Sequence, residues 1–287
     1  AHTVNSGASV SVTTSSGTKT LHAVTLNGTE ATWRLTTVAG ESSWVPVSVT
    51  AVGSATETTY SSVDGRVTAI LATEPSGVTC AALSSDGTGA DPGLADGCSA
   101  LIITYGQSTT ASSSGPGDYL DQVKKIDYWS SDEHFTVASY RYDLAGNLVS
   151  VTDRFGRTTH YTYASHGGLT QLSGQVVTAV ANGVDTVVEA GYHYAYDSSK
   201  RLIGVARDNA DGSSGTIAIS KFVYDAPLTG EGLPDIAGQM GKWGQTVSPV
   251  HLGLVYGQND PTGVNVKNAL LYYSDEQGNV TNSATFG

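Results

Sequence analysis

The stretch that most constrains the fold of this chain is residues 140–163, which reads YRYDLAGNLVSVTDRFGRTTHYTY. Three runs rich in aromatic and β-branched residues are separated by two turn segments that contain Gly146 and Gly156. Aromatic and β-branched residues favour extended strands, whereas Gly, Asn and Asp favour tight turns. The pattern therefore predicts a meander of antiparallel β-hairpins.

Similar units recur along the chain. Residues 192–205 (YHYAYDSSKRLIGV) repeat the order of tyrosine, aspartate, turn and apolar run, and weaker copies occupy residues 60–70 and 269–280. The aspartates are expected at turn entries, where a carboxylate can accept main-chain N–H groups, and the glycines are expected to adopt positive φ. Tyrosines at alternate positions are expected to place rings on one sheet face, where cross-strand aromatic pairs stabilise the sheet. The predicted motif residues are Tyr140, Tyr142, Asp143, Gly146, Gly156, Tyr161, Tyr163, Tyr192, Tyr194, Tyr196, Asp197, Tyr273, Asp275 and Gly278.

The composition agrees with an all-β protein that has few or no helices. Of the 287 residues, 34 are glycine and one is methionine, and charged residues make up only 14%. Long periodic runs of Ala, Leu, Glu and Lys, which are typical of helices, are absent from the sequence. The length is ample for burying a core, so we predict an all-β protein of repeated antiparallel hairpins.

The charge balance argues against two classes of partner. Fourteen Lys and Arg against 26 Asp and Glu give a formal net charge of −12. Such a chain is poorly suited to neutralise phosphates, so we expect no nucleic-acid partner. No run approaches the roughly 18 consecutive apolar residues that span a bilayer, so we expect no membrane insertion.

The two cysteines predict a disulfide and, through it, an oxidising compartment for the protein. Cys80 and Cys98 flank a Ser-, Gly- and Asp-rich segment that is typical of a loop, which favours a disulfide over a pair of free buried thiols. Closing a loop of this length stabilises a fold by about 3 kcal/mol in the chain-entropy model. A disulfide implies an oxidising compartment, so we expect a secreted protein, extracellular or in the cell wall. The start at Ala1 without a methionine fits a mature or excised segment.

We divide the chain into three parts that together form one continuous β body. Residues 1–135 are a β region with the disulfide-closed loop, residues 136–225 hold the hairpin repeats, and residues 226–287 combine an irregular segment with a partial further repeat. In the first part, Pro46 suggests an edge or the start of a strand. Residues 118–129 are ambiguous, but their two-residue alternation favours a strand. The last residues read as the beginning of another strand, which predicts a longer parent protein or disorder beyond it.

On these units, the chain resembles the RHS/YD-repeat family, whose tyrosine–aspartate repeats build toxin-complex shells, bacterial RHS proteins and animal teneurins. The segment from Gly97 to Gly106 also resembles secreted actinobacterial members. The resemblance implies a strip of hairpins that coils into a hollow shell around a toxic or adhesive payload. The units of this chain would form one arc of such a shell or a smaller sandwich-like body. The second unit departs from the family pattern, because it has Ser-Lys-Arg where the family favours Gly-Arg.

Few residues suggest chemistry. His160 and His193 each lie beside a tyrosine, and a Tyr/His pair can act as base and acid in a polysaccharide lyase. We favour solvent-facing strand positions for both, because no catalytic partner can be placed. A metal site at His160 and His166 is a weak alternative. The acidic loops at residues 86–91 and 208–212 offer oxygen ligands for Ca²⁺ but lack the EF-hand pattern, which favours plain turns and no cofactor. The four tryptophans, Trp33, Trp44, Trp129 and Trp243, fit a core better than a carbohydrate groove.

Three functions follow as hypotheses. The first is a non-enzymatic structural segment of an RHS/YD-repeat shell, in toxin encapsulation or cell-surface interaction. Its partners would be other segments of the same longer chain or an enclosed payload. The second is a β module that binds glycans or a cell surface, and the third is a lyase-like enzyme.

Overall fold

The chain folds into antiparallel β-structure in two compact units. The computed structural model describes residues 8–54, 57–72, 77–81, 83, 92–166, 169–181, 183–209, 214–230, 232–236, 240–242, 244 and 248–285. The units are Ala1–Thr158 and Thr159–Gly287. Eighteen strands belong to one sheet, and the one helical element with assigned bounds in the described part is a short 3₁₀ turn, η1 (Val266–Asn268). The predicted all-β class is confirmed, and the three-part division of the sequence stays a prediction.

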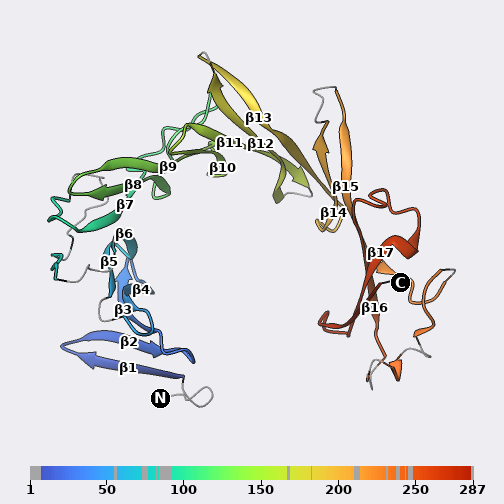
Figure 1. Ribbon diagram of the computed structural model, residues 1–287, viewed down its shortest axis with the longest axis horizontal. Helices are drawn as coiled ribbons and strands as arrows, with labels where there is room; N and C mark the ends of the chain where they lie inside the picture. Colours follow the sequence, from blue (N-terminus) through green and yellow to red (C-terminus); the bar gives the residue numbers. More distant parts are fainter. Residues whose placement is uncertain are drawn as a thin grey trace. The chain divides into compact units, whose positions relative to one another are not determined.

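In the first unit, each strand pairs antiparallel with the next one in the chain (Figure 1). The strands are β1 (Ser9–Ser15), β2 (Thr18–Val24), β3 (Glu30–Val38), β4 (Glu41–Thr50), β5 (Thr58–Val63), β6 (Arg66–Leu71), β7 (Ser99–Tyr105), β8 (Val123–Ser130), β9 (His134–Tyr142) and β10 (Leu148–Asp153). The ambiguous segment therefore contains a strand, as its alternation predicted. Pro46 lies inside β4 at a register shift opposite Trp33, before the first residue that pairs with β5, so the prediction of a strand start is wrong and its edge character is right.

The second unit continues the same pattern. Its strands are β11 (Arg157–His166), β12 (Leu169–Ala181), β13 (Val184–Tyr196), β14 (Leu202–Asp208), β15 (Thr216–Ala226), β16 (His251–Tyr256), β17 (Ala269–Ser274) and β18 (Val280–Thr285). From β12 onward, each strand pairs antiparallel with its successor. β16 was not predicted from the sequence, although its alternating Leu252, Leu254 and Tyr256 were a usable signal.

Two stretches of sheet have a fully buried face. In the first unit, β6 and β7 bury Ala69, Leu71, Ala100 and Ile102 beneath the segment that Cys80 and Cys98 close. The predicted disulfide is present, with a Cα–Cα distance of 5.8 Å. In the second unit, β16 and β17 supply the buried set. Its members are Leu252, Leu254, Tyr256, Ala269, Leu271 and Tyr273.

The repeat turns are built around aspartate carboxylates. Asp143 Oδ1 accepts the main-chain N–H groups of Ala145 and Asn147, both at 2.9 Å, and its carbonyl accepts the N–H of Gly146. Asp275 repeats this arrangement with Gln277 and Asn279. Gly146 and Gly278 adopt φ values of 86° and 82°. The predicted roles of these aspartates and glycines are thus confirmed.

Two further turns show which positions of the motif are interchangeable. Asp153, which was not among the predicted motif residues, accepts the N–H groups of Phe155 and Arg157 in the same way. In the Asp197 turn, Lys200 stands where the other turns have glycine, and it adopts a φ of 68°. A lysine in this left-handed region carries a steric cost that glycine avoids. The departure of this unit from the family pattern is therefore a site of local backbone strain.

The repeat tyrosines anchor neighbouring strands through their hydroxyl groups. Tyr142 in β9 donates to the carbonyl of Val123 in β8 at 2.7 Å, and Tyr196 in β13 donates to Leu172 in β12 at 2.8 Å. Tyr142 also makes a tilted aromatic contact with Tyr119. The hydroxyl bonds thus tie β9 to β8 and β13 to β12.

Candidate functional site

The tyrosine–aspartate pair Tyr224–Asp225 departs from the role that this pair has elsewhere. Tyr224 keeps its anchor, because its hydroxyl donates to the carbonyl of Leu202 at 2.8 Å. Asp225 lies inside β15 at a register shift between Val223 and Ala226, with a φ of 54°. Bulges and left-handed residues of this kind re-aim side chains and recur beside functional sites. This irregularity makes the surroundings of Asp225 the candidate site.

The Asp225 carboxylate joins two basic groups. Its Oδ2 lies 2.7 Å from Nη1 of Arg201, and its Oδ1 lies 3.4 Å from Nδ1 of His251. The hydrogen bond from Arg201 is the main reason that the pKa of Asp225 is lowered. Arg201 also pairs with Asp197 at 2.9 Å and lies over the Tyr224 ring at 4.5 Å. One arginine thus connects the strained turn to the candidate site.

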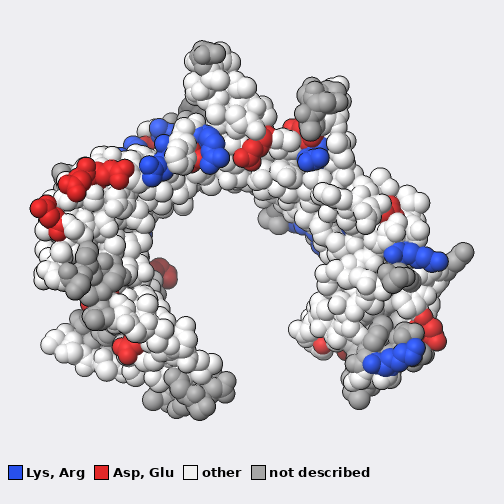
Figure 2. Space-filling view, viewed as in Figure 1, with Lys and Arg blue, Asp and Glu red and all other residues white. Residues whose placement is uncertain are grey.

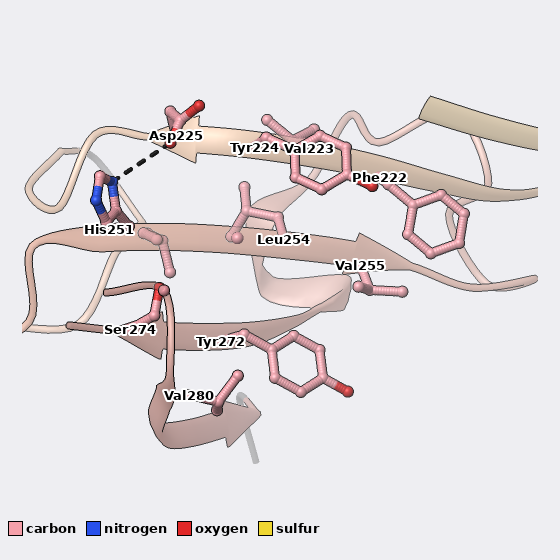
Figure 3. Close-up of a pocket in the computed structure, with 13 residues that line it drawn as sticks. Phe222, Val223, Tyr224, Asp225, His251, Leu254, Val255, Tyr272, Ser274 and Val280 are labelled. Atoms are coloured by element: carbon pink, nitrogen blue, oxygen red, sulfur yellow. Dashed lines mark ion pairs between the residues drawn. The ribbon is translucent and has the colours of Figure 1, made fainter. Parts of the chain in front are cut away.

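An apolar groove extends from this polar end across the open face of β15, β16 and β17 (Figure 3). Its volume is about 370 Å³. Gly253 forms part of its floor, and the rings of Phe222, Tyr224 and Tyr272 lie toward the end away from Asp225. The face opposite to Gly253 belongs to the buried set of Leu252 and Leu254. The groove therefore has a rigid floor and aromatic sides.

This arrangement is suited to binding rather than to nucleophilic catalysis. Ser274 pairs with His251 in the register of β16 and β17, so a carboxylate, an imidazole and a hydroxyl follow one another across three strands. No hydrogen bond joins Ser274 to His251 among those of the described residues, and a serine nucleophile needs that bond to its base. The groove instead offers apolar rings and a few polar groups, which is the usual composition of a ligand site.

The two histidines proposed as catalytic lie apart. His160 contacts Thr178 Oγ1 at 3.0 Å, and Thr178 pairs with Val187. His193 contacts Asp208 Oδ1 at 2.7 Å. His193 pairs with Gly174, which precedes Thr178 by four residues along β12, or roughly 13 Å at the rise of a strand. The structure therefore gives each histidine its own partner and does not combine them into an acid–base pair.

The structure tests the other predicted sites only in part. Asp208 contacts Gly191 and His193, while residues 84–91, Trp243 and the His166 side chain lie outside the described residues. Trp129 packs against the first core, as predicted for a core tryptophan, but Trp44 is 39% exposed. No group of three or more His, Cys, Asp or Glu suited to a metal occurs in the described part. The expectation of plain turns without a cofactor stays a prediction.

Comparison with known families places the repeat region. Residues 142–183 match the family model described as RHS Repeat. This segment of the chain is similar to an RHS repeat. The match begins at Tyr142 and includes the turns of Asp143 and Asp153, so the recognition made from the tyrosine–aspartate units is confirmed. The candidate groove lies beyond the matched residues.

Comparison with solved structures finds chains that are much longer than this one. The crystal structures of TcdB2-TccC3-TEV and TcdB2-TccC3 each align over 93% of this chain with 12% identity and a TM-score of 0.32. The chain spans 16% of the length of each of those chains. A search of curated proteins finds no match. In the described residues, no helix is long and apolar enough to cross a membrane.

Proposed function

We propose that this chain is a non-enzymatic wall segment of a secreted RHS-repeat shell, in which it packs against other segments of a longer protein and helps to enclose a payload. The repeated Asp-centred hairpin turn carries the proposal. Together with the tyrosine anchors, this turn adds one strand after another in chain order, which is what an extended wall requires. The Cys80–Cys98 disulfide supports an extracellular or cell-wall location.

The test uses the natural full-length protein. Cryo-electron microscopy is expected to show these hairpins as part of a continuous wall around an enclosed segment, and limited proteolysis is expected to leave that segment intact. A full-length protein in which these hairpins form a separate body, with no enclosed segment, would contradict the proposal. Thiol labelling of the secreted fraction without reductant is expected to leave Cys80 and Cys98 unmodified.

The groove favours glycan binding as a second function. Aromatic rings attract the C–H faces of sugars through their negative π-faces, and the polar end offers hydrogen-bonding groups. Because Arg201 balances the Asp225 carboxylate, a neutral glycan fits better than a charged one. This function is compatible with a wall segment that meets a cell surface.

A glycan array with the purified chain tests this second function. Neutral glycans are expected to bind, and Gly253→Val is expected to abolish binding by filling the groove. The nearest atom that a Cβ at Gly253 would meet outside its chain neighbours is the Val223 carbonyl oxygen at 3.8 Å, so the variant should fold. Gly204→Ala, whose Cβ has similar room in β14, is the matched control. An array without bound glycans would remove this function and leave the wall proposal intact.

A further inference from the structure

The far half of the β12–β13 hairpin extends beyond its neighbour. Pairing with β12 continues along β13 to Val184, but pairing with β14 covers only Tyr192 to Tyr196. In these registers, residues 184–190 have a partner strand on one side only. Figure 1 shows this end of the hairpin standing clear of β14. A strand paired on one side presents its main-chain N–H and C=O groups on the other side.

Asp208 marks where the β13–β14 ladder stops. Its Oδ2 accepts the N–H of Gly191 at 3.1 Å, and its Oδ1 lies 2.7 Å from Nε2 of His193. A Cβ at Gly191 would lie 2.4 Å from Asp208 Oδ2, so this contact depends on glycine. The last position of β14 is therefore fixed, and the free edge of β13 begins directly beyond it.

This free edge is unusually apolar. On β13, Val184, Val187 and Val188 expose 64%, 58% and 49% of their surface, and Val180 of the paired strand β12 exposes 65%. Native proteins normally protect exposed β-branched edges with lysine, proline or a covering element. Residues 169–196 contain no lysine, arginine or proline. Such an edge is a template for pairing with another strand.

The charges on this hairpin indicate which kind of partner strand can pair with its free edge. The carboxylates of residues 169–196 are Asp185 and Glu189, and Figure 2 shows no basic surface on the projecting part of this hairpin. A second copy that paired antiparallel about Val187, the middle of the free segment, would place its Glu189 opposite Asp185. Like charges directly opposite each other destabilise a sheet. A partner strand with basic residues at these two positions would gain energy instead.

We propose that residues 184–190 bind an extended segment of a partner protein as an added antiparallel β-strand. The partner segment carries apolar or β-branched residues against the exposed valines and Lys or Arg opposite Asp185 and Glu189. Main-chain hydrogen bonds supply general affinity, and the two charge pairs supply the register. None of these residues lines the groove, so the edge adds a function to the proposed structural role.

The test uses two labelled synthetic peptides and the whole chain. The peptide Thr-Lys-Val-Thr-Val-Lys-Thr places its lysines opposite Asp185 and Glu189 in antiparallel register, and a control peptide has glutamate in place of both lysines. Fluorescence anisotropy is expected to show saturable binding of the lysine peptide at least about tenfold tighter than the glutamate peptide. Hydrogen exchange is expected to slow at residues 184–190. Equal binding of the two peptides, or binding of neither, would overturn the proposal.

Charge reversal supplies the decisive variant. The double variant Asp185→Lys and Glu189→Lys alters exposed positions only and is expected to exchange the peptide preference. Glu276→Lys, which changes an exposed residue in a different turn, is the control and should leave binding unchanged. If the unmodified chain instead dimerises in sedimentation experiments and the double variant does not, the occupant is a second copy and the proposal is wrong.

Discussion

The two buried cores of this protein are stabilised in different ways. Beneath the Cys80–Cys98 segment, the first core consists largely of small residues, including Ala69 and Ala100 beside Ile102. The second core, on β16 and β17, uses large side chains such as Leu271 and Tyr273, each 0% exposed. Both cysteines of the chain lie in the first unit. A covalent link thus accompanies the core that buries less apolar side chain.

The difference shows that the size of the core side chains decides how the segment packed over each core is held in place. The first core is covered by Val78, Leu83 and Leu94, which lie in or beside the disulfide-closed loop. The second is covered by Leu228, Leu233 and Ile236 from the segment after β15, without a covalent link. Because hydrophobic stabilisation scales with buried apolar area, large core residues hold their cover by packing alone. A core of small residues buries less apolar area, so a disulfide that restricts the unfolded chain adds a larger share of its stability.

The largest effect is expected in the second core. Leu271→Ala should lower the free energy of unfolding of the second unit by about 3 to 4 kcal/mol, because it removes buried apolar surface and leaves a cavity. Hydrogen exchange resolved by segment measures the loss, which should be greatest on β16 and β17. Val264→Ala, at an 85% exposed position, is the control. A loss below 1 kcal/mol would show that packing does not hold this cover.

The next effect belongs to the first core. Replacing both Cys80 and Cys98 by serine should lower the stability of the first unit by about 3 kcal/mol, since the unfolded loop is no longer restricted. The same measurement should show faster hydrogen exchange on β6 and β7 and unchanged exchange on β16 and β17. Equal loosening of both cores would break the comparison, because it would mean that the disulfide acts on the whole chain.

A smaller gain is expected at the strained turn. Lys200→Gly should stabilise the second unit by about 1 kcal/mol, because glycine adopts the positive φ without a Cβ clash. Gly278→Ala, at the same position of another turn, should lose a similar amount, and thermal unfolding measures both. If Lys200→Gly is instead destabilising, the lysine side chain contributes more than the strain costs.

The smallest effect per residue comes from acid. Hydrogen bonds lower the folded-state pKa of two turn aspartates, mainly from the Arg201 N–H at Asp197 and from the Asn279 side chain at Asp275. A lowered pKa contributes stability above the unfolded value of 3.8, and this stability is lost as the pH falls below it. Stability measured from pH 5 to pH 2 should therefore fall, and less steeply in the Asp275→Asn variant. An unchanged slope would mean that the Asp275 carboxylate is not needed in its ionised form.

The turns were predictable because their chemistry is local. The interactions of Asp143 with residues up to Asn147 follow from five consecutive letters of sequence, and the same holds for Asp275. The groove was not predictable in this way. It depends on a bulge that frees Asp225, on its meeting with Arg201 and His251, and on a glycine between aromatic strands. These are non-local consequences of register, which a single sequence does not state.

The order of strand pairing has a consequence for how the chain folds. In the described part of the chain, the paired strands follow one another in the sequence. Most of these pairings close short loops, and the longer connections before β7 and β16 still join consecutive strands, so the topology has a low contact order for a β-protein of this length. Each hairpin can form as soon as its second strand is available and can then serve as the template for the next. The chain is therefore suited to folding progressively from one end, for example as it emerges from a ribosome or a secretion channel.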